Sequence, residues 1–142
     1  MAATFTPAPR PLSARERLLA GYRNMALWTL QGWISMFFIA AGYAKLSEPM
    51  DNLVALMSWP AMVSPAFVRG LGIAEIVLAL GMLAPLVSWT FGRPLVVVSA
   101  AGLVGLEAIM LVVHILGGNA GLAIVNLILL GLTIPVLLGR RA

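Results

Sequence analysis

The sequence contains no cysteine and few charged residues. Among its 142 residues there is one histidine, and Asp, Glu, Lys and Arg together make up 10%. Without cysteine, the chain by itself cannot form a disulfide, a thiolate metal site, an iron–sulfur centre or a redox dithiol. An average soluble domain has about 25% charged residues, whereas here 61% of the residues are hydrophobic. A soluble fold of this size could not bury so much apolar surface, which excludes a large aqueous domain.

The apolar residues gather in four long stretches, and each has about the 20 residues that a helix needs to cross a bilayer. The spans must be helical, because a helix satisfies its own backbone hydrogen bonds in lipid whereas four strands could not close a barrel. The sequence therefore predicts an all-α membrane protein, with a four-transmembrane-helix bundle in residues 24–139. The predicted spans are residues 25–44, 67–88, 95–116 and 122–138.

The two ends of the chain are basic. Residues 1–23 form a proline-containing tail, and its part from residue 13 to 23 is predicted to be a short interfacial helix. Residues 140–142 form a basic C-terminal end.

The connections between the spans are short except for one. The loop of residues 45–66 is predicted to contain a short amphipathic helix on the membrane surface, because Leu53, Leu56 and Met57 fall at helical spacing. Tight turns are expected at residues 89–94 and 117–119.

The basic residues predict an orientation in the membrane. With the N-terminus in the cytoplasm, only Lys45 and Arg69 lie on the far side. Cytoplasmic loops are enriched in Lys and Arg, so both termini are predicted to be cytoplasmic. The same distribution, at the ends of apolar segments, argues against nucleic acid as a partner. The predicted cytoplasmic side holds seven arginines: Arg10, Arg15, Arg17, Arg23, Arg93, Arg140 and Arg141.

Polar residues inside the spans form the most informative pattern, because a charged group in hydrocarbon costs at least about 2.5 kcal/mol and usually finds a partner. By helix rise they fall in the outer half of the membrane, while the inner half looks dry apart from Gln31 and Ser99. We expect them to form a polar pocket beneath the surface helix. The alternative is that they only hold helices together and bind no ligand. The candidate residues are Tyr43, Lys45, Arg69, Glu75, Glu107, His114 and Asn126.

Two pairings are expected among these residues. Either Lys45 or Arg69 should pair with Glu75. His114 lies two helical turns after Glu107 on the same side of its helix, and it should bond to Glu107 or to Asn126.

Three stretches resemble the DoxX-like family of small four-helix membrane proteins. They are the segment Gly-Tyr-Ala-Lys-Leu at 42–46, the segment Arg-Gly-Leu-Gly-Ile-Ala-Glu at 69–75, and a third span that finishes at His114. The resemblance covers nearly the whole chain after Arg23. It places Lys45, Glu75 and His114 on the family's characteristic polar positions, whereas Glu107 matches no family motif.

The resemblance implies an accessory subunit or factor for quinone-linked redox or oxidative-stress chemistry, in a bacterial cytoplasmic membrane. A quinone or quinol would be the bound molecule, and no intrinsic cofactor or metal is expected. The partner would be another membrane or redox protein or a second copy of the chain, and independent enzymatic activity is not expected. The alternatives are a non-catalytic scaffold for a larger complex and, ranked last, a small-solute or proton pathway.

Overall fold

The computed structural model describes residue 10 and residues 12–141. Every regular element in this part of the chain is helical, and no strand occurs in it. Four of the helices are long and apolar enough to cross a membrane, which confirms the predicted class of fold. The elements are α1 (Ala14–Ser47), α2 (Met50–Met57), η1 (Trp59–Met62), α3 (Pro65–Leu83), η2 (Ala84–Leu86), α4 (Trp89–Leu116) and α5 (Ala120–Arg141).

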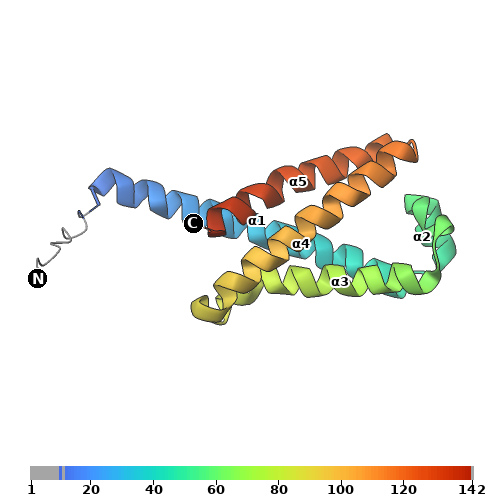
Figure 1. Cartoon of the computed structure of the whole chain (residues 1–142), viewed down its shortest axis with the longest axis horizontal. Helices are drawn as coiled ribbons and strands as arrows, with labels where there is room; N and C mark the ends of the chain where they lie inside the picture. The colour runs from blue at the N-terminus through green and yellow to red at the C-terminus, as the bar shows by residue number, and fades with distance from the viewer. Residues whose placement is uncertain (1–9, 11, 142) are drawn as a thin grey trace, which may run out of the picture.

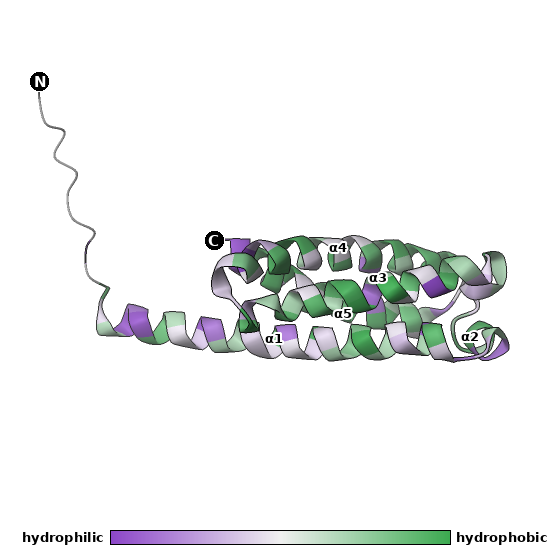
Figure 2. Cartoon of the chain, turned by 90° about the horizontal axis from the view of Figure 1, so that it is seen from below, coloured by the Kyte–Doolittle hydropathy of each residue, from purple (hydrophilic) through white to green (hydrophobic). Residues whose placement is uncertain are grey.

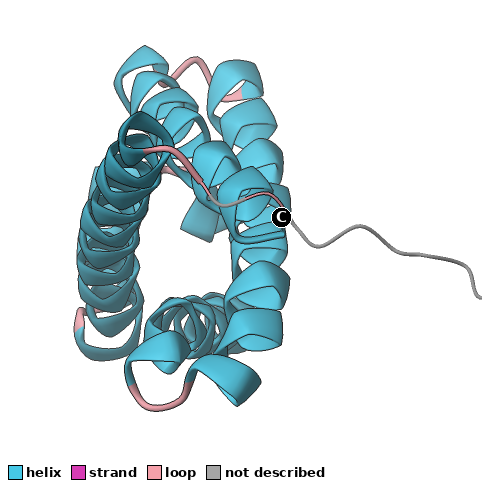
Figure 3. Cartoon of the chain, turned by 90° about the vertical axis from the view of Figure 1, so that its left-hand side faces the viewer, coloured by secondary structure: helices cyan, strands magenta, loops and turns pink. Residues whose placement is uncertain are grey.

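The four long helices run alternately up and down. Helix α1 packs against α3 and α5, and α4 packs against the same two helices, so the bundle closes as a ring of neighbours (Figures 1 and 3). We call the end that holds α2 and η1 the loop end, and the opposite end, where α5 finishes, the terminal end (Figure 1). Which end faces the cytoplasm stays a prediction.

Helix α1 is one continuous helix of 34 residues. At 1.5 Å per residue it is about 51 Å long, well beyond the roughly 30 Å of the hydrocarbon core. Its first turns project past the terminal end of the bundle, and the described residues before Leu27 are all exposed (Figure 2). The prediction of a separate interfacial helix at residues 13–23 is therefore wrong. Ser13 does cap the start, since its hydroxyl accepts from the amide of Glu16 at 3.3 Å.

The connection between α3 and α4 also differs from the prediction. Helix α3 ends at Leu83, and Pro85 lies in the single turn η2 that follows. Residues 89–94, expected to be a turn, are instead the first residues of α4. Pro94 is tolerated because it lies in the second turn of the helix, where only one backbone hydrogen bond is lost. Gly92 lets this turn press directly against Pro85.

The loop end is closed by α2 and η1. Leu53 of α2 and Trp59 of η1 are buried against Val68, with Met110 of α4 packed beside them. The chain reverses at Ser58, whose φ is 64°. A short helix thus lies inside the long loop. The prediction that it rests on a membrane surface stays a prediction.

Much of the apolar surface of the bundle points outward. Ile73, Val77 and Leu80 of α3 are more than half exposed, as suits side chains that face lipid. Close helix packing depends on two small residues, because the backbones of α1 and α3 meet at Gly42 and Gly72. An added Cβ on Gly42 would lie 2.5 Å from the carbonyl oxygen of Gly72.

Candidate functional site

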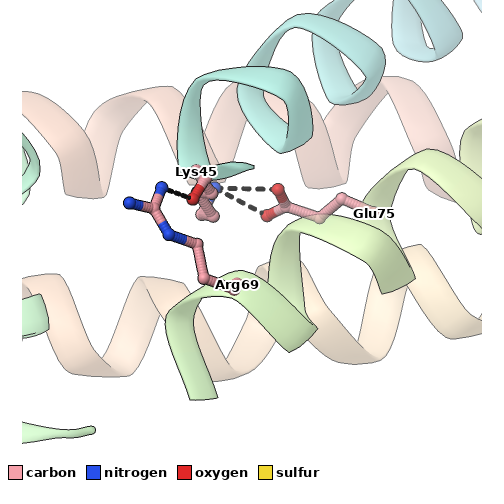
Figure 4. Close-up of polar contacts among 3 residues, drawn as sticks. All are labelled: Lys45, Arg69 and Glu75. Atoms are coloured by element: carbon pink, nitrogen blue, oxygen red, sulfur yellow. Dashed lines mark hydrogen bonds and ion pairs between the residues drawn. The ribbon is translucent and has the colours of Figure 1, made fainter. Parts of the chain in front are cut away.

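A buried ion pair joins α1 and α3 near the loop end. The Nζ of Lys45 donates to both carboxylate oxygens of Glu75, at 2.9 and 2.8 Å (Figure 4). The side chains are only 7% and 4% exposed. Lys45 lies opposite Gly72 and Glu75 lies opposite Gly42, so the close approach of the two backbones at these glycines brings the two side chains within reach.

Arg69, the other cation expected as a partner of Glu75, binds the end of α1 instead. Its guanidinium donates to the backbone carbonyl of Lys45 (Figure 4) and, at 2.8 Å, to that of Glu48. Lys45 lies in the last turn of α1 and Glu48 is the C-cap residue of this helix. The final four carbonyls of a helix have no partner inside it. Of the two cations considered for Glu75, Lys45 forms the pair, and Arg69 caps α1 instead.

A cavity of about 100 Å³ lies beside the ion pair, between the helices and beneath η1. Its walls are mainly apolar, with Phe37, Phe38 and Trp59 supplying aromatic rings. Five of the seven candidate residues line it: Lys45, Glu75, Glu107, His114 and Asn126.

Glu107 is fully buried and has one partner. The hydroxyl of Thr133 on α5 donates to its Oε1 at 2.8 Å. Its second oxygen, Oε2, has no hydrogen-bond partner in the described part of the chain. Because a buried, unpaired carboxyl oxygen costs about 1–3 kcal/mol or more, it is the polar atom at this cavity most in need of a ligand or water.

The expected bonds of His114 are not formed in the described structure. Glu107 takes Thr133 as its partner, and the amide of Asn126 donates to the carbonyl of Leu122 at 2.9 Å, within its own helix. His114 is buried and lines the cavity beside these groups. Tyr43 does not line the cavity, since its side chain is 65% exposed on the outer surface of α1.

A second polar cluster lies at the terminal end, where the sequence pattern suggested an almost dry interior. Arg140 is 5% exposed. Its Nε donates to Gln31 at 2.6 Å and its Nη1 to Asn24 at 2.8 Å. Gln31 in turn donates to the carbonyl of Met82 at 2.8 Å. The expectation that the polar groups are confined to one half of the bundle is therefore wrong, as is the placement of Arg140 outside the helical domain.

The sequence did hold a signal for the buried positions that were missed. Thr133 and Arg140 follow Leu129 at intervals that keep one face of a helix inward. That face of α5 is buried from Leu129 to Arg140, so an arginine in this register points into the bundle. The residues of the face are Leu129, Thr133, Val136 and Arg140.

These helices, apolar on the outside and polar at selected inner positions, define a multi-pass integral membrane protein. Residues 29–136 match the model of the DoxX-like family, and the chain belongs to that family. The matched range includes Lys45, Glu75, Glu107 and His114. No curated protein and no solved structure matches the chain.

Proposed function

We propose that the protein is a membrane accessory factor for quinone-linked redox chemistry, and that the cavity at the loop end receives the ring of a quinone or quinol. The observation that carries the proposal is the unpaired Oε2 of Glu107 in a cavity with aromatic walls. Ligand sites in proteins combine apolar walls with a few placed polar groups. A quinone ring has the matching chemistry, with flat apolar faces and an oxygen at each end.

The cavity must widen before it can hold a quinone ring. About 100 Å³ is less than the roughly 150 Å³ of an engineered cavity that binds benzene, so the walls must yield when a ring binds. Met57 of α2 and Met110 of α4 both line the cavity. Methionine is unbranched and adapts to irregular space. Movement of these two side chains would widen the cavity under α2 without displacing the ion pair.

The polar residues would hold and protonate the ring oxygens. The carboxyl of Glu107 would bind one oxygen, as donor when protonated and as acceptor when ionised. His114, whose ordinary pKa is near neutrality, is the residue suited to exchange protons at the other oxygen. A bound ring would supply the electron-transfer chemistry, in a two-electron, two-proton exchange with a partner protein or a soluble substrate.

A scaffold role is the second candidate, and one observation favours it. Both oxygens of Glu75 are already taken by Lys45, so this pair fixes the register of α1 and α3 without a ligand. The small exposed residues Gly70 and Ala74 on α3 would suit close contact with a partner helix. A proton or solute pathway ranks below both, because the buried apolar Val136 separates Thr133 from Arg140 on α5.

Filling the cavity tests the quinone proposal. Ala41 lines the cavity, whereas its neighbour Ala40 is exposed on the outer side of the same helix. Ala41→Leu should abolish equilibrium binding of a radiolabelled short-chain quinone to the purified protein in detergent, and Ala40→Leu should leave it unchanged. Thermal unfolding of both variants reports whether they are folded. Unaltered quinone binding by folded Ala41→Leu would refute the proposal and leave the scaffold role.

A further inference from the structure

The terminal end contains a basic pocket that the quinone proposal does not use. Its volume is about 270 Å³. It lies between the projecting part of α1, the start of α4 and the end of α5. Three arginines line it, one from each helix: Arg23, Arg93 and Arg140.

Arg140 is a buried cation that has no acidic partner among the residues that the structure describes. Its two side-chain acceptors, Gln31 and Asn24, are both neutral. The third nitrogen of its guanidinium, Nη2, is buried with no hydrogen-bond partner among the described residues. A buried charge is costly unless it is compensated. All five acidic side chains of the sequence lie elsewhere in the structure, and none pairs with Arg140.

The arrangement around Arg140 is preorganised. Its guanidinium carbon lies 5.0 Å from the ring centroid of Trp28 and 5.3 Å from that of Trp89. The Nε of Arg93 donates to the backbone carbonyl of Arg140 at 3.5 Å, which keeps two cations side by side. An arginine fixed by aromatic rings and neutral acceptors keeps N–H groups for a further acceptor, and its planar guanidinium suits phosphate.

A second surface feature distinguishes a lipid from a soluble anion. A groove of about 470 Å³ shares Arg93 and Arg140 with the pocket and continues along Val97 and Val98 of α4. Val98 is 65% exposed on the lipid-facing side of the bundle. A phosphate group seated between the arginines would therefore have an apolar track beside it for an acyl chain. Basic pockets between transmembrane helices are known to bind anionic lipid headgroups.

We propose that this pocket is a binding site for the phosphate group of an anionic phospholipid, with the arginines on the headgroup and the valine track of α4 on an acyl chain. The site lies at the opposite end of the bundle from the quinone cavity, so a failure of one proposal leaves the other unaffected. The lipid would join α1, α4 and α5 beside Arg140, for which the described residues supply no acidic partner.

The test compares lipids that differ only in headgroup, bound to the full-length protein in detergent and counted by native mass spectrometry. Phosphatidylglycerol should bind more tightly than phosphatidylcholine with the same acyl chains. The double variant Arg23→Gln/Arg93→Gln should weaken phosphatidylglycerol binding by about 25-fold, at about fivefold for each arginine. It keeps Arg140, whose removal could unfold this end of the bundle.

The matched control is Arg15→Gln/Arg17→Gln, which removes the same charge from exposed positions on α1 that do not line the pocket. Its binding of phosphatidylglycerol should equal that of the unmodified protein. Equal binding of the two lipids, or an equal loss in both double variants, would overturn the proposal. If inorganic phosphate at equal concentration displaces phosphatidylglycerol, the lipid proposal is wrong and the site binds a soluble anion.

Discussion

The ion pair between Lys45 and Glu75 gives the most direct quantitative prediction. Charges about 4 Å apart attract by about 4 kcal/mol at an effective dielectric constant of 20. Removal of one partner also leaves the other charge buried at 7% or 4% exposure. Loss of one member of a buried pair costs about 3–5 kcal/mol, so Lys45→Met and Glu75→Gln should each lower the free energy of unfolding by that amount.

The double variant Lys45→Met/Glu75→Leu tests whether the loss in the single variants comes from the charge left unpaired. Replacing both partners by apolar residues of similar volume removes the buried charges together, which is often neutral. Its free energy of unfolding should lie within about 1.5 kcal/mol of the unmodified protein, above both single variants. Reversible unfolding of the purified protein in mixed micelles, followed by circular dichroism, measures all four proteins.

One outcome would contradict this reasoning. Hydrogen bonds between transmembrane helices contribute about 0.6 kcal/mol on average. If each single variant loses only that much, the pair is wetted through the cavity and behaves as an ordinary interhelical contact. Glu75 would then be available to a ligand, which would strengthen the case for a functional role of this carboxylate.

Two further variants test packing and the partner of Glu107. Gly42→Ala should destabilise the bundle by about 2 kcal/mol or more, because the added Cβ would lie 2.5 Å from a backbone oxygen of the facing helix. Gly32→Ala, where nothing lies within 4 Å, should be neutral or slightly stabilising in the same unfolding assay. Thr133→Val should cost about 1–3 kcal/mol because Glu107 loses its donor. Thr29→Val, at an exposed hydroxyl that bonds only within its own helix, should change the unfolding midpoint little, and equal losses in both threonine variants would contradict the role of Thr133.

Much of the candidate site could be predicted from polar residue types at membrane depth. Lys45, Glu75, Glu107, His114 and Asn126 were all expected near one end of the bundle, and all five line the same cavity. Their cost in hydrocarbon makes them face inward, and helix rise gives their depth along the bundle. Tyr43 was misplaced because a residue near a helix end can face lipid at the interface without cost.

Apolar composition and the helix period by themselves determined that the chain has four membrane-crossing helices and which polar residues lie at similar depth. Only the tertiary structure decided the partners: Lys45 with Glu75, Thr133 with Glu107, and Gln31 with Arg140. The physical reason is that the rotation of each helix about its axis is weakly encoded. Lipid-facing and core-facing side chains are equally apolar. Which side of each helix faces its neighbours is therefore decided only when the helices pack at close contacts such as the one at Gly42.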